Sequence, residues 1–341
     1  MNVSMSDIKV SVCIISFNQQ NYIRQCLDGV FSQKTNFEYE VIIRDDCSTD
    51  NTYLTIMEYI DTLDEEKKKN IKITVLDGTK NIGANNNFIE TFKTSVGQWL
   101  AICEGDDYWC DQGKLQKQYD YAISHSDCSL VVHPALISEN NVIRKTSWAC
   151  MNKTINQLSD VIRAKGQFSP TGSYFFKREI LNVLPLWFST APVGDYYMEI
   201  FATSLGSCHT IPDAMSVYRI NSTGSWSDLL KKDRNGQRII NTYLSQLEYL
   251  DKLAEIFPSC VDDITIKRSH AQYAAAMGYL ANGDYTNFRI LMDKSDTNGW
   301  YDNMHSIFYY LRNSRALSML MFRFKPAIKS AVMWGRRVFN N

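Results

Sequence analysis

The chain has 341 residues, of which 45% are hydrophobic and 21% are charged, a composition typical of a folded globular protein and not of a disordered one. Its 36 basic and 37 acidic side chains give a formal net charge of −1. This balance argues against a general nucleic-acid binder, because such proteins carry an excess of Lys and Arg. The length predicts about two domains, or one large α/β domain with an appendage.

Four units of a strand followed by a helix are predicted in the first third of the chain. The strands are expected at Val10–Ser16, Tyr39–Arg44, Ile71–Leu76 and Trp99–Cys103, and the helices at Tyr22–Gln33, Thr52–Leu63, Asn85–Thr94 and Lys114–Ser124. The strands are almost continuously apolar, as strands buried on both faces of a parallel sheet are. The pattern therefore predicts a doubly wound α/β sheet, whose ligands bind beyond the carboxyl ends of the strands.

The periodicity becomes looser after this part and is helical at the end. We expect strands at Cys128–His133, Ser173–Lys177 and Ala214–Ile220, a helix at Asp195–Leu205, and long amphipathic helices at Ile239–Phe257 and Ile264–Leu280. Residues 1–225 are therefore predicted to form the α/β domain and residues 226–341 an α-helical appendage.

The end of the chain is basic, and the cysteines show no pairing pattern. Residues 303–341 include Arg312, Arg315, Arg323, Lys325, Lys329, Arg336 and Arg337 but no Asp or Glu. No apolar run reaches the roughly 18 residues of a membrane span, and the start MNVSMSDIKV lacks a secretory pattern, which predicts a cytoplasmic protein. The nine cysteines form no C-x-x-C pair, which favours reduced thiols.

Carboxylates follow two of the predicted strands. The four strand exits read SFNQ, DDCSTD, DGTKNIGANNN and EGDDYW, and the chain contains neither G-x-G-x-x-G nor the P-loop motif. Acids gathered at one sheet edge repel each other, and a divalent cation or the hydroxyl donors of a ligand would stabilise them. A sugar and a metal-bound diphosphate supply both. The structural alternatives are that Ser48 or Asp50 caps the next helix and that Asp106-Asp107 is a solvated turn, although the following Trp109 argues against such a turn.

These segments together resemble a known family. VSVCIISFNQQNYIRQCLDGVFSQ, VIIRDDCSTDNT, NIGANNN and EGDDYW are similar to the ordered motifs of family 2 glycosyltransferases, inverting enzymes that use nucleotide-diphosphate sugars. The resemblance covers about residues 9–225. It implies a GT-A fold, that is, a Rossmann-like and mainly parallel sheet flanked by helices.

The resemblance also implies roles for individual residues. The expected nucleotide-binding residues are Ser16, Phe17, Asn18, Asp46, Asn81, Asn87, Asp106 and Arg219, and the expected ligands of Mn²⁺ or Mg²⁺ are Asp106 and Asp107. Phe17 would lie against the nucleobase and Asp46 would bind the uracil or the ribose. Glu104 stands where the family more often has Asp.

Asp195 is the expected catalytic base, in a segment where Gly194 replaces the usual Glu. The alternative for Asp195 is a helix N-cap or a favourable position near the helix dipole. Arg219 could bind the pyrophosphate or, equally, form a salt bridge that fixes the last strand. Asn221 replaces a frequent His in the same segment.

Other residues have a structural and a functional interpretation. His133 and His209 lie in apolar neighbourhoods and are expected to be satisfied histidines of the core or its rim. Trp148, Trp187 and Trp226 are candidates for a sugar-acceptor groove, although core packing is favoured for each. Residues 303–341 either contact an anionic membrane surface, which we favour, or pack on the appendage.

The sequence therefore predicts an inverting, metal-dependent transferase. It would move a sugar from a nucleotide-diphosphate donor, expected to be UDP-linked, to a hydroxyl of a free or lipid-linked bacterial surface glycan such as capsule, O-antigen or lipopolysaccharide. The rivals are a sugar nucleotidyltransferase, a nucleotide-sugar or glycan-binding protein without catalysis, and a membrane-associated scaffold. The first is disfavoured because its glycine-rich, basic loop after strand one is absent. The expected location is the cytoplasm, with peripheral contact to the inner face of the membrane through residues 303–341.

Overall fold

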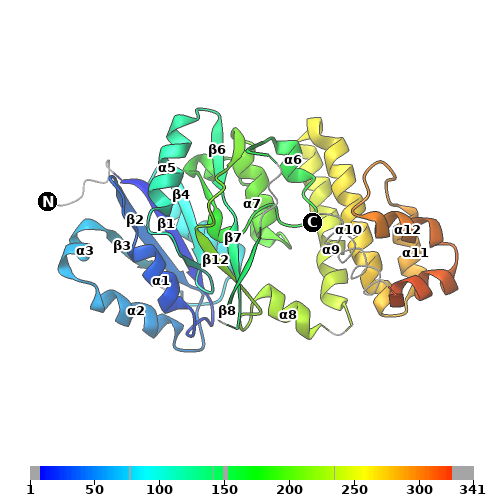
Figure 1. Ribbon diagram of the computed structural model, residues 1–341, viewed down its shortest axis with the longest axis horizontal. Helices are drawn as coiled ribbons and strands as arrows, with labels where there is room; N and C mark the ends of the chain where they lie inside the picture. The colour runs from blue at the N-terminus through cyan, green and yellow to red at the C-terminus, as the bar shows by residue number, and fades with distance from the viewer. Residues whose placement is uncertain (1–7, 77, 141, 149–152, 234, 325–341) are drawn as a thin grey trace. The chain divides into compact units, whose positions relative to one another are not determined.

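The computed structural model describes residues 8–76, 78–140, 142–148, 153–233 and 235–324. The chain divides into two compact units, Met1–Leu229 and Leu230–Asn341 (Figure 1). The sequence predicted a division after residue 225. Each unit is described below by itself.

The first half of the first unit consists of alternating strands and helices. The strands are β1 (Ile8–Ser16), β2 (Glu38–Asp45), β3 (Lys72–Leu76) and β4 (Trp99–Glu104), and the helices are α1 (Ile23–Phe31), α2 (Thr52–Thr62), α3 (Glu65–Asn70), α4 (Ala84–Thr94) and α5 (Lys114–Ser124). The four strands are parallel and lie in the order β3-β2-β1-β4. The four predicted strand-helix units are confirmed.

Helices cover both faces of this sheet because successive side chains of a strand point to opposite sides. Val12 and Ile14 of β1 belong to a core cluster that also holds Ile23 and Leu27 of α1. Cys13 points the other way, where a hydrogen bond to its thiol comes from Thr91 of α4. Burial on both faces explains why these strands are continuously apolar.

The second half of the sheet is mixed. It contains β6 (Cys128–Val132), β9 (Ile155–Asn156), β10 (Phe175–Lys177) and β11 (Ser207–Thr210), and its helical segments are α6 (Leu158–Ile162), α7 (Gly194–Thr203) and the 3₁₀ turns η1 (Thr171–Ser173), η2 (Arg178–Asn182) and η3 (Leu186–Thr190). β10 runs antiparallel between β4 and β6, so the sheet continues as β4-β10-β6-β11-β9. β11 is parallel to β6.

A second, smaller sheet packs the segments after β4 against later parts of the chain. Its order is β5 (Tyr108–Trp109), β12 (Ser216–Ile220), β7 (Ala135–Glu139) and β8 (Val142–Trp148). Ser216 pairs with Trp109 and Val217 with Tyr108. The turn after β4 is thereby fixed to β12, more than a hundred residues later in the chain.

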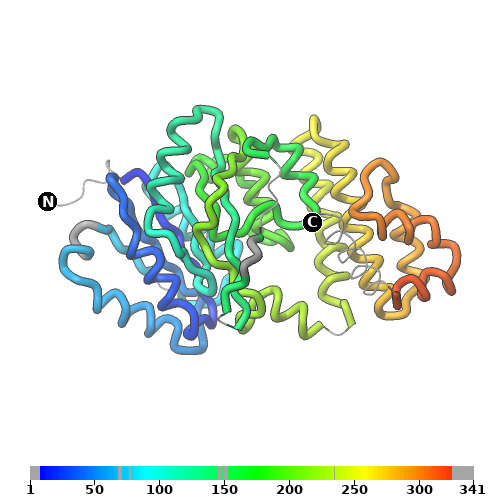
Figure 2. The backbone as a smooth tube through the Cα atoms, viewed as in Figure 1, coloured from blue at the N-terminus to red at the C-terminus, as the bar shows by residue number. Residues whose placement is uncertain are grey.

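The second unit is helical. Its helices are α9 (Gln237–Ile256), α10 (Val261–Ala281), α11 (Tyr285–Asp293) and α12 (Asn303–Leu311), with the turn η4 (Pro258–Cys260) between the first two, and α8 (Trp226–Lys232) spans the boundary between the units. α9 and α10 lie side by side (Figure 2). Tyr273, Phe288 and Phe308 form the centre of its core. The predicted helical appendage is confirmed, and residues 315–324 are helical as well.

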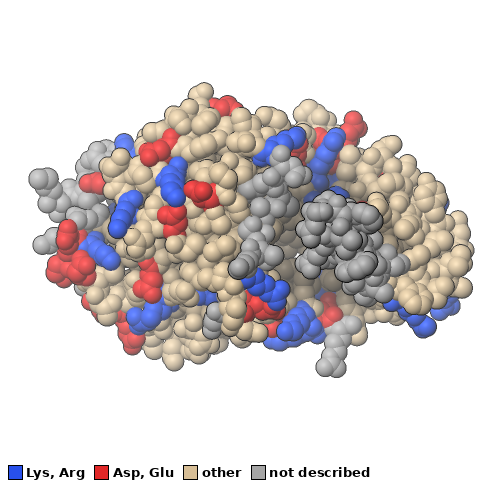
Figure 3. All heavy atoms as spheres, viewed as in Figure 1, with Lys and Arg blue, Asp and Glu red and all other residues tan. Residues whose placement is uncertain are grey.

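The surface carries both signs of charge. Acidic and basic side chains are interspersed on the face of the first unit seen in Figure 3. The cysteines of the described segments are free thiols, of which Cys47 and Cys110 are exposed. Within those same segments, no helix has the length and apolar character needed to cross a membrane.

Candidate active site

The loops that leave β1 and β2 are joined by hydrogen bonds. Ser16 Oγ donates to Asp45 Oδ1 at 2.9 Å, and the Asn18 amide donates to Ser48 Oγ at 2.8 Å. The Asn18 side chain in turn accepts from the backbone N–H of Thr49 at 2.8 Å. The polar groups of Ser16 and Asn18 therefore hold the two loops together.

Phe17 is left on the outside of these joined loops. It lies between Ser16 and Asn18, and its side chain is 43% exposed. Asn18 has φ of 54°, in the left-handed region, so the chain turns sharply just after the phenyl ring. An exposed ring on a fixed loop is a suitable platform for a planar ligand.

The helix cap that we expected after β2 is different in the structure. We expected Ser48 or Asp50 to cap α2, but the N-cap residue is Asn51, and Ser48 Oγ donates to Asp45 Oδ1 at 2.6 Å. Asp50 accepts the backbone N–H of Thr52, the first residue of α2, at 2.9 Å. Asp50 therefore satisfies a donor at the start of the helix.

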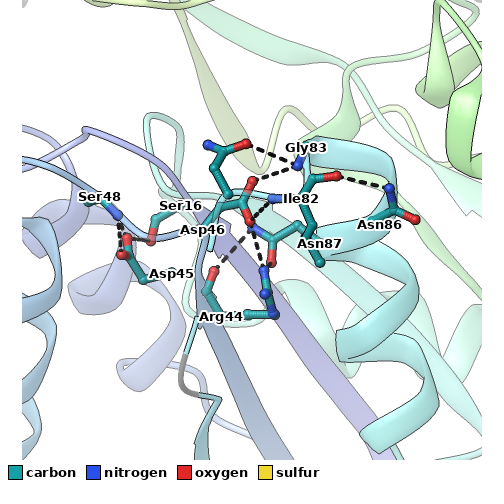
Figure 4. A network of polar contacts seen from close by, with 10 residues as sticks. Ser16, Arg44, Asp45, Asp46, Ser48, Ile82, Gly83, Asn86 and Asn87 are labelled. Atoms are coloured by element: carbon teal, nitrogen blue, oxygen red, sulfur yellow. Dashed lines mark hydrogen bonds and ion pairs between the residues drawn. The ribbon is translucent and has the colours of Figure 1, made fainter. Parts of the chain in front are cut away.

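Asp46 accepts hydrogen bonds from the loop that precedes α4 (Figure 4). Its Oδ1 accepts from the Ile82 amide and from Arg44 Nη1, both at 2.9 Å, and its Oδ2 accepts from the Gly83 amide at 2.8 Å. A carboxylate has about four acceptor sites, so Oδ2 retains capacity for one further donor. Asp46 is 2% exposed, and the Arg44 guanidinium compensates the charge of this buried carboxylate.

Asn81 and Asn87 occupy different environments in the same network. Asn81 is exposed and its Oδ1 accepts from the Gly83 amide at 3.2 Å. Asn87 is 1% exposed; its Oδ1 accepts from Arg44 Nη1 at 2.8 Å and its Nδ2 donates to the Arg44 carbonyl at 3.3 Å. Asn87 therefore holds Arg44 behind Asp46 and presents almost no surface to a ligand, unlike what we expected from the sequence.

The two acids expected to bind metal are placed differently. Asp107 is buried, and its Oδ1 accepts the backbone N–H of Arg219 at 2.8 Å, which anchors β12. Asp106 is partly exposed, and its Oδ2 accepts from Ser222 Oγ at 2.7 Å. Asp106 is thus the more accessible of the two carboxylates.

Arg219 is used inside the protein. Its guanidinium carbon lies 4.6 Å from the ring centre of Tyr108 and 5.2 Å from that of Tyr22. The guanidinium donates to the Asp106 carbonyl and to Gln25 Oε1. Of our two interpretations, these hydrogen bonds and ring contacts favour a residue that fixes the last strand.

Asp195 and the acids after β4 converge although they lie far apart in the sequence. Asp195 stands in the first turn of α7, where its Oδ1 accepts the Tyr196 amide at 2.8 Å. Burial, with a smaller contribution from the negative charges of Asp106 and Asp195, raises the pKa of Glu104 to about 8, while a hydrogen bond from Thr171 acts in the opposite direction. The fold therefore concentrates negative charge from two segments at one place.

This concentration of charge suits a divalent cation. The described part of the chain holds no group of three or more His, Cys, Asp and Glu side chains arranged to bind a metal. Mg²⁺ and related cations nevertheless bind through one or two carboxylates together with water and substrate phosphate oxygens. Asp106 and Glu104 fit such an open site, because a cation there would offset the burial that raises the pKa of both carboxyls and the repulsion that adds to it at Glu104.

Sequence reasoning missed Glu199, one turn after Asp195. This carboxyl is buried; it accepts from the backbone N–H groups of Phe168 and Ser169 at 2.9 and 2.7 Å and from the Tyr174 hydroxyl at 2.7 Å. Burial raises its pKa to about 8, and these hydrogen bonds act in the opposite direction. An acid within the apolar run YYMEIFA was the available signal.

The tryptophans and histidines that we weighed lie mainly within the fold. His133 and His209 are fully buried. The Trp148 ring packs on Tyr218 with 5.1 Å between centroids, and the Trp187 ring on Tyr197 with 5.2 Å. Trp226, in contrast, is 45% exposed.

The fold and the acids at the sheet edge define a class of protein, and solved structures share the fold. TarS 1–349 of S. aureus in complex with UDP-GlcNAc has a TM-score of 0.51 and 16% identity, covering 86% of this chain and 93% of that one. The mannosyltransferase PcManGT of Pyrobaculum calidifontis, in complex with GDP-Man and Mn²⁺, has a TM-score of 0.52 and 14% identity, covering 93% and 87%. The protein has the GT-A type fold that we predicted.

The family follows from the sequence comparison. The family described as glycosyl transferase family 2 matches residues 11–184, about half of the chain, and the protein belongs to this family. An uncharacterised protein of Mycobacterium tuberculosis is 32% identical over 223 residues, which are 64% of this chain and 60% of that protein. The chain thus spans less than two thirds of that relative's length.

A relative whose name states an activity is less similar in sequence. The UDP-Glc:alpha-D-GlcNAc-diphosphoundecaprenol beta-1,3-glucosyltransferase WfgD of Escherichia coli is 26% identical over 142 residues, which are 41% of this chain and 51% of that enzyme.

Proposed function

We propose that the protein is an inverting glycosyltransferase that moves a sugar from a UDP-linked donor to a hydroxyl of a bacterial surface glycan. The observation that carries this proposal is that acids from two distant segments, Glu104 and Asp106 after β4 and Asp195 at the start of α7, meet around Glu104, whose pKa both aspartates raise. An inverting transferase needs a base beside the attacking hydroxyl, across the anomeric carbon from the departing diphosphate. Family membership supports the same reaction class.

Phe17 and Asp46 are proposed to recognise the nucleobase. The exposed Phe17 ring would stack on the base, and the remaining acceptor site of Asp46 Oδ2 suits the N–H of uracil. Ser16, Asn18 and Asn81 would maintain the loops that carry these two groups. The UDP complexes of TarS, a structure of the same fold, support UDP as the nucleotide.

Asp195 is proposed to take the proton from the attacking acceptor hydroxyl. The acceptor oxygen forms the new bond to the anomeric carbon while the bond from that carbon to the diphosphate oxygen breaks, and UDP leaves. A single displacement on an α-linked donor gives a β-linked product. A carboxylate near a helix N-terminus is not a strong base, so its contribution comes from its closeness to the hydroxyl.

Asp106, with Glu104 beside it, is proposed to hold Mn²⁺ or Mg²⁺. When bound, the cation would stabilise the negative charge that develops on the diphosphate. We assign Asp107 to anchoring β12 through Arg219, in place of the ligand role that we expected from the sequence. The complex of PcManGT with GDP-Man and Mn²⁺ supports a metal in this fold.

A glycan or lipid-linked glycan is proposed as the acceptor, on the inner face of the cytoplasmic membrane. WfgD is named for a diphosphoundecaprenol-linked acceptor. Helix 315–324 presents Leu317, Leu320 and Phe324 to the solvent, each about half exposed, together with exposed Arg315 and Arg323. Exposed apolar and basic side chains on one helix are typical of a segment that binds the surface of an anionic membrane. The basic residues from Lys325 onward lie outside the described residues.

UDP release from a panel of UDP-sugars, with Mn²⁺, with Mg²⁺ and with EDTA, tests the proposal. We expect release that requires a divalent cation and increases when a glycan acceptor is added. Nucleotide binding without turnover of any donor would instead indicate a binding protein. Release of diphosphate from a sugar phosphate and UTP would indicate a nucleotidyltransferase.

A further inference from the structure

Asn85 connects two parts of the first unit that are about a hundred residues apart in sequence. It lies in the first turn of α4, two residues after Gly83, whose amide binds Asp46. Its Nδ2 donates to the carbonyls of Phe188 at 3.0 Å and Ala191 at 2.9 Å. Both hydrogens of one amide group are therefore used to hold the segment that leads into α7.

Gly194 fits against the other side of the same amide. A Cβ atom at position 194 would lie 1.9 Å from Asn85 Oδ1 and 2.7 Å from its Cγ. Asn85 cannot move away easily, because its Nδ2 is bound to two carbonyl oxygens. Because Gly194 has no side chain, Asn85 can reach the carbonyl oxygens of Phe188 and Ala191.

The same segment is also packed on α7 itself. The Trp187 ring, in the turn η3, lies 5.2 Å from the ring centre of Tyr197 and 5.8 Å from that of Phe201. A displacement of η3 would thus be passed to the start of α7, where Asp195 stands. The Asn85 side chain thus connects the loop whose amides bind Asp46 with the turn η3, which packs on α7.

We propose that Asn85 is a positioning residue, which sets the place of Asp195 relative to the bound donor. The inference rests on the proposed function, since it takes Asp195 as the base and Asp46 as part of the nucleotide site. Asn85 itself would touch neither substrate. Its role would be to keep the base within reach of the acceptor hydroxyl, where a displacement of about 1 Å costs up to 100-fold in rate.

The first test compares Asn85→Ala with the control Glu90→Ala, which alters a partly exposed residue of the same helix whose carboxylate pairs with Lys93. We expect Asn85→Ala to lower kcat for transfer by about 10- to 100-fold while the Kd for UDP stays within about twofold. Asn85→Asp should be at least as impaired, because its carboxylate would face two carbonyl oxygens. Unchanged kcat in Asn85→Ala would overturn the proposal.

Combination variants separate positioning from general loss of structure. Gly194→Ala should lower kcat as Asn85→Ala does, and Asn85→Ala with Gly194→Ala should be no slower than Asn85→Ala alone, because both changes break one contact. If the loss of kcat in the double variant equals the product of the two single losses, the two residues act independently, which would contradict the inference. If Asn85→Asp fails to fold, the Ala variants still decide.

Asp195→Asn, measured beside these variants, distinguishes the inference from the proposed function. We expect Asn85→Ala to cause no further loss of kcat in the Asp195→Asn background, because there is then no base to position. If Asp195→Asn transfers as the wild type does, the assignment of the base has failed. If Asp195→Asn is inactive but Asn85→Ala is fully active, only the role of Asn85 has failed.

Discussion

Two adjacent carboxylates, Asp106 and Asp107, have different surroundings. Asp107 accepts a backbone N–H of β12 and is buried, whereas Asp106 is partly exposed and accepts from Ser222. The same type of side chain thus anchors a strand at position 107 and remains accessible to a ligand at position 106. The sequence GDD could not separate these uses, because the difference arises from contacts with residues more than a hundred positions away.

The two isosteric amide variants should therefore differ. Asp106→Asn is expected to weaken metal-dependent UDP binding by about 10-fold or more, because a charged ligand of the cation is lost. Asp107→Asn keeps an acceptor for the Arg219 amide but places a new donor in a buried site, so it should lower the free energy of unfolding by about 1–3 kcal/mol. Titration calorimetry and urea unfolding measure the two effects. The reverse pattern would assign the metal to Asp107.

At the scale of elements, the strands of the parallel half were the easiest to predict. β1, β2 and β4 are buried on both faces, so their apolar runs are unambiguous. α3 was missed because EEKKKN has no apolar periodicity, and β5 because two residues show no period. β7 (ALISE) and β8 (VIRKTSW) were missed because polar residues interrupt their apolar ones. The insertion of β10 between β4 and β6 depends on long-range packing alone.

The sequence also predicted only part of the candidate site. Residues directly after parallel strands, such as Asp46 and Asp106, meet at one sheet edge for topological reasons, and the sequence indicated them. Asn85 and Glu199 were not indicated, because their partners are carbonyls and amides of distant loops. Asn87 was assigned to the ligand, although its side chain holds Arg44. A local motif does not distinguish a side chain that binds a ligand from one that supports it.

Helix α5 begins with a buried lysine, which makes a pH prediction possible. Lys114 Nζ donates to Gln118 Oε1 at 2.6 Å and lies 4.1 Å from the centre of the Trp109 ring. Burial lowers the pKa of Lys114 to about 7, from 10.5 for an exposed lysine. Between these values the unfolded chain binds more protons than the folded one, so this residue makes stability rise with pH.

Urea unfolding at pH 7.0 and 8.5 should detect this contribution. The wild type is expected to gain stability relative to Lys114→Met as the pH rises, by up to about 1.4 kcal/mol per pH unit. Below pH 7 both states of the wild type carry the proton, so the difference should level off. Parallel pH profiles of wild type and variant would contradict a lowered pKa for Lys114.

At the scale of the whole molecule, the charge is nearly balanced but unevenly distributed. Residues 303–341 contain no acid, and the described part of this segment exposes apolar and basic side chains together. Arg312 is an exception, since it is paired with Asp293 and lies over the ring of Tyr309. The described part of the segment is therefore partly tied to the helical unit and partly exposed to solvent, as the proposed contact with a membrane surface requires.

Sedimentation with lipid vesicles tests this proposal. The full chain should sediment with vesicles that contain anionic phosphatidylglycerol and much less with neutral phosphatidylcholine vesicles. Leu320→Glu combined with Phe324→Glu should reduce this binding, and exposure of both residues predicts little change in melting temperature. Equal sedimentation of the variant and the wild type would reject a role for this helix.

The central claim is that Asp195 takes the proton from the acceptor beside a UDP-sugar site. Its most direct test measures UDP affinity and sugar transfer for Asp195→Asn, with Asp213→Asn as a control at an exposed acid that lies 3.4 Å from Lys117. We expect Asp195→Asn to bind UDP within about twofold of the wild type and to lose transfer by at least about 100-fold, while the control keeps both. Transfer at the wild-type rate by Asp195→Asn would contradict the central claim.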